Sequence, residues 1–124
     1  MPLTIQLLEV PSAKTLRLDG RLDNETAGDL DRELDRVLET PVKTLIFDLA
    51  RLDYTTSAGL RTFLRAQKSM SERSGQTLFV NLQPPVQKVF DIVKVANLSL
   101  VFRSVQELDA YLDVMQKKAA KESR

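Results

Sequence analysis

The spacing of apolar residues switches repeatedly between a strand period and a helix period along this chain, and this alternation restricts the fold more than any other feature. Residues 44–50 (TLIFDLA) and 77–82 (TLFVNL) are short and nearly continuous apolar runs, as expected of strands buried on both faces. Each run is followed by a segment whose apolar residues have helical spacing. Strands that alternate with helices predict a mostly parallel sheet with right-handed crossovers.

The N-terminal part of the chain predicts a hairpin and then a helix. Segments 4–10 and 14–20 show partial period-two alternation and are joined by a turn that contains a proline, which predicts two antiparallel strands. The next segment has apolar residues along one helical face. Asn24 or Thr26 is the expected N-cap of this helix, and Pro41 prevents its continuation.

The remaining elements follow from local signals of the same kind. A helix is expected from Ala58, and another opens at a proline pair, Pro84-Pro85. Residues 98–102 (LSLVF) predict a last short strand. Ser104 and Glu107 have the spacing of a capping box, which predicts a final helix.

Together these elements predict one α/β domain in the order β-β-α-β-α-β-α-β-α. The mixed, mostly parallel sheet would have about five strands, with about four helices. The length of 124 residues fits a single domain. We place that domain at residues 1–116 and interpret residues 117–124 (KKAAKESR) as a frayed basic tail.

Three missing residue types exclude several classes of chemistry. The chain has no His, no Cys and no Trp. It therefore has no imidazole base, no Ser-His-Asp triad, no thiolate nucleophile and no ligand set for structural zinc. We expect a protein that is not an enzyme, with no catalytic residues, no metal and no cofactor.

Net charge and hydropathy further restrict the class of protein. The formal net charge is +1, whereas a nucleic-acid-binding domain of this size usually has a strongly basic face. No apolar run approaches the ~20 residues of a membrane span, and the N-terminal segment lacks the features of a signal peptide. We expect a cytoplasmic protein without nucleic-acid or membrane partners.

The segment between the first parallel strand and its helix carries an unusual run of hydroxyls. Residues 50–61 (ARLDYTTSAGLR) place Thr55, Thr56 and Ser57 directly before the helix, at the strand end where α/β proteins usually have their sites. In one interpretation, Ser57 is simply the N-cap of the helix. In the other, a hydroxyl of this run accepts a phosphoryl group, which the free N–H groups and the dipole of a helix N-terminus stabilise.

Two motifs resemble those of STAS domains, the family of the anti-sigma-factor antagonists. LIFDLARLDYTTSAGLRTFL is similar to the family signature of a buried strand, a turn, a serine and a Gly-Leu pair that opens the second helix. GRLDNETAGDL is similar to the family segment GELD-x-x-TA-x-x-L. The predicted order of elements also matches the STAS fold.

This resemblance implies roles for individual residues. Ser57 matches the serine that the cognate kinase phosphorylates, and Thr56 and Thr55 are alternative acceptors. Thr56 stands where many antagonists have Asp, and Ala58 stands where they have a second Ser. The implied partner-binding surface consists of Asp23, Asn24, Thr55, Thr56, Ser57, Ala58, Gly59, Leu60 and Arg61.

The resemblance also implies a partner switch. The unmodified protein would bind an anti-sigma factor that is itself a serine kinase with a histidine-kinase-like ATPase fold. Phosphorylation at Ser57 would release that partner, and a metal-dependent serine phosphatase would reverse the modification. Two other functions remain open for such a domain: a constitutive scaffold subunit of a lipid-transport ABC system, or a nucleotide-sensing STAS domain.

Overall fold

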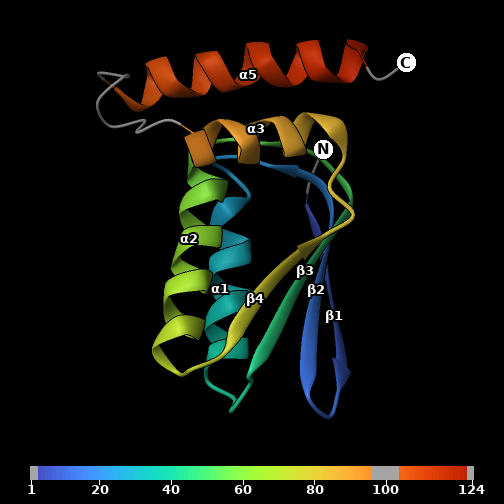
Figure 1. The fold of residues 1–124 in the computed structure, drawn as a ribbon, viewed down its shortest axis with the longest axis vertical. Coiled ribbons are helices and arrows are strands. Elements are labelled where there is room, and N and C mark those ends of the chain that lie inside the picture. Colours follow the sequence, from blue (N-terminus) through green and yellow to red (C-terminus); the bar gives the residue numbers. More distant parts are fainter. Residues whose placement is uncertain (1–2, 96–103, 123–124) are drawn as a thin grey trace.

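One four-stranded sheet organises the molecule, with strand order β1-β2-β3-β4 (Figure 1). The computed structural model describes residues 3–95 and 104–122. Its elements are β1 (Thr4–Val10), β2 (Ala13–Leu22), α1 (Ala27–Leu38), β3 (Thr44–Thr55), α2 (Ser57–Glu72), β4 (Gln76–Val80), α3 (Pro84–Val95) and α5 (Val105–Glu122).

The direction of the strands confirms the predicted α/β class. β1 and β2 form the expected antiparallel hairpin, while β2, β3 and β4 run parallel to one another. The helices between the parallel strands begin where the helical periods begin in the sequence. The strand predicted at residues 98–102 lies outside the described residues.

The core lies between the sheet and the helices α1 and α2 (Figure 1). Leucines from β2 and β3 point into it, and an aromatic cluster joins the sheet to α2 and α3. Phe47 of β3 packs against Phe63 of α2 and Phe79 of β4, with ring centroids 5.1 and 5.2 Å apart. Phe90 of α3 then packs against Phe79 at 5.1 Å. This packing joins β3 and β4 to α2 and α3.

β3 is longer than the sequence predicted. The apolar run suggested a strand over residues 44–50 followed by a turn, but the strand continues to Thr55. The reason is that β2 also extends to Leu22 and pairs with β3 as far as Thr55, through two shifts in register. β4 pairs only with residues 44–48 of β3. The last part of β3 therefore has one edge that β4 does not cover.

α3 and α5 lie across the end of the sheet at which β3 stops (Figure 1). The predicted cap at Ser104 is confirmed, since the N–H of Glu107 donates to the Ser104 hydroxyl at 3.1 Å. α5 continues through Glu122, so residues 117–122, which the sequence assigned to a frayed tail, are helical. No helix in the described ranges has the length and hydropathy needed to cross a membrane.

Candidate functional site at the β3–α2 junction

A single residue, Thr56, separates β3 from α2. Its N–H donates to the carbonyl of Leu22 at 3.0 Å, and its own carbonyl accepts the N–H of Leu60 at 3.1 Å. With φ −104° and ψ 178° its backbone is extended, so Thr56 is the N-cap and Ser57 is the first helical residue. The interpretation of Ser57 as the N-cap was therefore wrong, because the extended residue before the helix is Thr56 and the helical backbone begins at Ser57.

The three hydroxyls of the junction differ in their partners. The Thr55 hydroxyl donates to the carbonyl of Thr56 at 3.1 Å, and the Thr56 hydroxyl donates to Oδ1 of Asn24 at 3.5 Å. The Ser57 hydroxyl is buried and has no hydrogen-bond partner within residues 3–95 and 104–122. A buried polar atom without a hydrogen-bond partner destabilises a fold, so the Ser57 hydroxyl is the unusual group of this junction.

Gly59 allows the helix to approach the sheet closely. A Cβ at this position would overlap Oγ1 of Thr55 and lie 2.6 Å from the Leu22 side chain. Any larger residue would push the first turn of α2 away from β2 and β3. The glycine that the sequence motif placed here is therefore required by packing.

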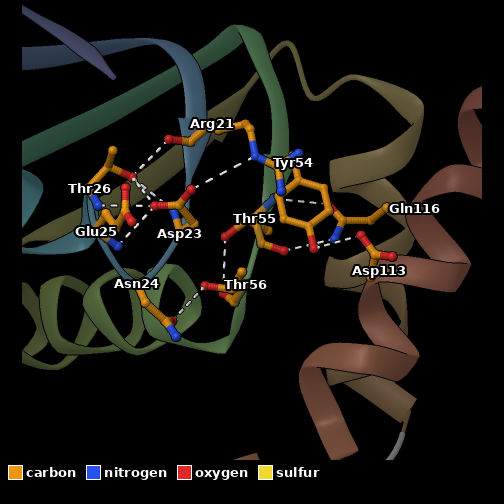
Figure 2. A network of polar contacts seen from close by, with 10 residues as sticks. All are labelled: Arg21, Asp23, Asn24, Glu25, Thr26, Tyr54, Thr55, Thr56, Asp113 and Gln116. Atoms are coloured by element: carbon orange, nitrogen blue, oxygen red, sulfur yellow. Dashed lines mark hydrogen bonds and ion pairs between the residues drawn. The ribbon is translucent and has the colours of Figure 1, made fainter. Parts of the chain in front are cut away.

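The loop between β2 and α1 lies beside the junction (Figure 2). Oδ1 of Asp23 accepts the N–H groups of Glu25 at 3.0 Å and Thr26 at 3.1 Å. The Thr26 hydroxyl in turn donates to the carbonyl of Arg21 at 2.8 Å. Asp23 thus shapes the loop that brings Asn24 to the hydroxyl of Thr56.

Two side chains of α5 bind the backbone of the junction. Gln116 accepts the N–H of Thr55 at 2.9 Å and donates to the carbonyl of the same residue at 2.7 Å, as Figure 2 shows. Oδ1 of Asp109 accepts the N–H of Ser57 at 2.8 Å. A carboxylate from a distant part of the chain therefore occupies the positive end of α2.

A third side chain of α5 binds the phenol that precedes the junction. The Tyr54 hydroxyl donates to Oδ1 of Asp113 at 2.9 Å, and the guanidinium of Arg21 lies 3.6 Å from the centre of the Tyr54 ring. Burial and the neighbouring Asp113 raise the pKa of Tyr54. The hydrogen bond from Lys117, with that from Tyr54, lowers the pKa of Asp113. Near neutral pH the phenol is protonated and the carboxylate is charged, as this hydrogen bond requires.

The structure brings the expected site residues together, but it buries many of them. Asn24 and Arg61 are exposed, Asp23 and Ala58 are half-buried, and the rest are buried: Thr55, Thr56, Ser57, Gly59 and Leu60. Their assignment to a partner-binding surface stays a prediction.

Sequence analysis missed the contribution of α5 to this site. Leu108 and Leu112 are apolar residues four positions apart in the last helix, and Gln116 continues the same four-residue spacing. Gln116 is 2% exposed. The signal that could have revealed this contribution is a polar residue at a core position of a helix, because a buried polar side chain needs hydrogen-bond partners.

An apolar groove of about 410 Å³ lies elsewhere, between α2, β4 and α3. Lys94 is the single titratable residue among those that line it, and leucine and phenylalanine predominate. It contains no pair of groups that could exchange a proton with a substrate. The hydroxyl junction therefore stays the candidate site.

Comparison with known proteins agrees with the fold and the motifs. The model of the STAS domain family matches residues 4–108. The chain belongs to the STAS domain family.

Two relatives of this STAS protein are named as anti-sigma factor antagonists. BtrV of Bordetella bronchiseptica, a proposed anti-sigma factor antagonist, is 35% identical over 75 residues, which are 60% of this chain and 65% of the relative. The STAS protein thus spans just under two thirds of that relative's length. The anti-sigma F factor antagonist of Paenibacillus polymyxa is 24% identical over 93 residues, 74% of this chain and 80% of the relative.

A solved structure confirms the STAS fold. The anti-sigma factor antagonist SpoIIAA in its unphosphorylated form superposes with a TM-score of 0.62 at 25% identity. The superposition covers 72% of this chain and 83% of the SpoIIAA chain.

Proposed function

We propose that this STAS protein is a cytoplasmic anti-sigma factor antagonist that works by partner switching. The unphosphorylated chain binds an anti-sigma factor that is itself a serine kinase, and phosphorylation of Ser57 ends that complex. The observation that carries the proposal is the unpartnered Ser57 hydroxyl in the first turn of α2. The names of the relatives support the class of partner.

Hydrogen bonding favours Ser57 over its neighbours as the acceptor. The hydroxyls of Thr55 and Thr56 already donate to the backbone and to Asn24. Phosphorylating either threonine would break an existing hydrogen bond. The Ser57 hydroxyl makes none with the described residues, so its modification breaks no hydrogen bond of the hydroxyl itself.

The partner must supply the chemistry of the transfer. The Ser57 oxygen attacks the γ-phosphorus of ATP, the bond to ADP breaks, and the hydroxyl proton passes to a base. This chain has no His, and no carboxylate of the described residues is hydrogen-bonded to the Ser57 hydroxyl. In this proposal the protein is the substrate of a kinase, and a metal-dependent serine phosphatase restores the hydroxyl by hydrolysis, with water attacking the phosphorus and inorganic phosphate leaving.

Electrostatics explain why one phosphate can act as a switch. The group adds about 1.5 to 2 negative charges at pH 7. Asp109 lies against the N–H of the same residue, 2.8 Å away. A like-charge pair about 4 Å apart costs about 4 kcal/mol at an effective dielectric constant near 20, before screening. This repulsion acts within the chain and weakens the hold of Asp109 on the junction. The partner is released because the same charge, together with the cost of desolvating the phosphate, enters the contact with the partner. Reversing that binding equilibrium from 1:99 to 99:1 takes about 5.5 kcal/mol.

Phosphorylation in an extract of the host cell tests the proposal. The purified chain is incubated with extract, ATP and Mg²⁺, and the modified residue is mapped by mass spectrometry. We expect phosphate on Ser57 and none on the Ser57→Ala variant, while Ser71→Ala, a change at an exposed serine of the same helix, is modified like the wild type.

Binding provides the second half of this test. The kinase purified from the extract should bind the wild type and should not bind Ser57→Asp. If Ser57→Ala is still phosphorylated stoichiometrically, or if Ser57→Asp binds the kinase as tightly as the wild type, the proposed function is wrong.

A further inference from the structure

We propose that α5 is an autoinhibitory cap on the junction. In the closed arrangement it covers Ser57, and its release, with the rest of the fold intact, exposes Ser57 to a partner or a modifying enzyme. The regulatory meaning of this cap rests on the proposed function. The physical opening of the helix does not.

The closed arrangement leaves Ser57 out of reach. The residue is 8% exposed, and its hydroxyl oxygen is fully enclosed. A kinase must bring the γ-phosphate of ATP into line with this oxygen, which needs open space on one side of it. The structure with α5 in place therefore cannot be the form that a kinase modifies.

Three polar side chains on one face of α5 hold it over the junction. Asp109, Asp113 and Gln116 are separated by four and three residues, so they lie on the same side of the helix. Each binds a different position of one short segment, at Ser57, Tyr54 and Thr55 respectively. Figure 2 shows the contacts of Asp113 with Tyr54 and of Gln116 with Thr55. All of these contacts join parts of the chain that are more than 50 residues apart.

The apolar anchoring of α5 is weaker than that of α2, and consists of Leu112, the partly buried Leu108 and the packing of the helix along α3. Leu112 is the one fully buried apolar side chain of this 18-residue helix, and Val105 and Val114 are 47% and 59% exposed. α2, by contrast, buries Leu60, Phe63, Ala66 and Met70 against the sheet. Segments that bury little apolar surface are the ones that open without global unfolding.

Water, a partner or a phosphate can also take over the polar contacts that α5 makes with the junction. If α5 leaves, water or a partner can bind the N–H and carbonyl of Thr55, because the edge of β3 at this position is not covered by β4. A phosphate on Ser57 would compete with the Asp109 carboxylate for the N–H of Ser57 and repel it. Phosphorylation thus favours the open arrangement, which couples the position of α5 to the state of Ser57.

Thiol labelling measures this opening without any partner. The chain has no Cys, so Ser57→Cys introduces a unique thiol at the enclosed position. We expect 5,5′-dithiobis(2-nitrobenzoic acid) to react with it at least 10-fold more slowly than with the thiol of Ser71→Cys, at an exposed position of α2. Adding Gln116→Ala should speed the reaction at position 57 at least 10-fold. Tyr54→Phe should speed it by a smaller factor, and neither change alters the charge near the thiol.

Two controls separate local opening from other causes. Ala66→Cys places a thiol in the core of α2, where labelling requires global unfolding, and its rate should not change when Gln116→Ala is added. Val114→Ala alters an exposed position of α5 and should leave the rate at position 57 unchanged.

Each contrary result overturns the proposal. The cap is absent if the thiol at position 57 reacts as fast as the one at position 71. It does not gate the site if Gln116→Ala and Tyr54→Phe leave the rate unchanged, or if the thiol at position 66 becomes reactive to the same extent. Because no kinase or partner takes part, this test can fail while the phosphorylation test succeeds, and the reverse.

Discussion

Two strand-to-helix junctions of the described residues, β2–α1 and β3–α2, are stabilised in opposite ways. At the β2–α1 junction the polar groups are satisfied locally: Asp23 accepts two N–H groups of the next three residues, and the Thr26 hydroxyl donates to Arg21. At the β3–α2 junction the backbone of Thr55 and Ser57 is satisfied by α5, from more than 50 residues away.

The β2–α1 junction makes its hydrogen bonds within its own loop, whereas the β3–α2 junction depends on hydrogen bonds from another element. Local hydrogen bonds form whenever the loop adopts its conformation, so the β2–α1 junction remains intact whatever happens elsewhere. When α5 moves, the β3–α2 junction loses the partners of the Thr55 and Ser57 backbone and keeps the hydrogen bond from the Thr56 N–H to Leu22. A site that must exchange one partner for another is better built in the second way, because its hydrogen bonds can be taken over.

The largest effect on stability is expected for Gly59→Ala, at the β3–α2 junction, and Gly28→Ala in the first turn of α1 serves as its control. Gly59→Ala forces a methyl group against Thr55 and Leu22, and overpacking of this kind costs about 1–3 kcal/mol. Gly28→Ala is the matched control, because its Cβ would meet only the side chain of Arg32, at 3.6 Å. This second change should stabilise α1 by about 0.5–1 kcal/mol through helix propensity.

Urea unfolding of both variants, followed by circular dichroism, checks this contrast. We expect the midpoint to fall for Gly59→Ala and to rise for Gly28→Ala. Equal shifts in the two variants would show that the close approach of α2 to the sheet contributes nothing to stability.

Local patterns in the sequence were enough to predict the order of the elements and to select the run of hydroxyls as a candidate site. They did not predict that α5 buries Ser57. Strand and helix periods depend on neighbouring residues, and the hydroxyls are contiguous, so both are visible in one segment at a time. The burial of Ser57 depends on Asp109 and Gln116, which are 52 and 59 residues further along the chain. No local period records such a contact. The single signal was the polar Gln116 at an inward position of the last helix.

A change at the β2–α1 junction should lower global stability without opening the other junction. Thr26→Val keeps the shape of a residue that is 8% exposed, but removes the hydroxyl that binds Arg21 and the N–H of Asp23. Leaving such groups without partners costs about 1–3 kcal/mol. We expect a fall of about 1.5 kcal/mol in the free energy of unfolding. Hydrogen exchange should show the amides of α5 and of Thr55 keeping their protection relative to the rest of the chain. Selective loss of protection in α5 would contradict the independence of the two junctions.

The smallest effect should be the pH dependence of the contact between Tyr54 and α5. The hydrogen bonds from Lys117 and Tyr54 lower the pKa of Asp113. A carboxyl whose pKa falls on folding adds stability above its unfolded pKa of about 4 and loses that contribution as the pH drops through the folded value. The free-energy difference between the wild type and Asp113→Asn should therefore be constant from pH 7 to about pH 5 and shrink below about pH 4. Urea unfolding at a series of pH values measures it, and a difference that persists unchanged at pH 2.5 would remove the Asp113 carboxylate from the forces that hold α5 on the β3–α2 junction.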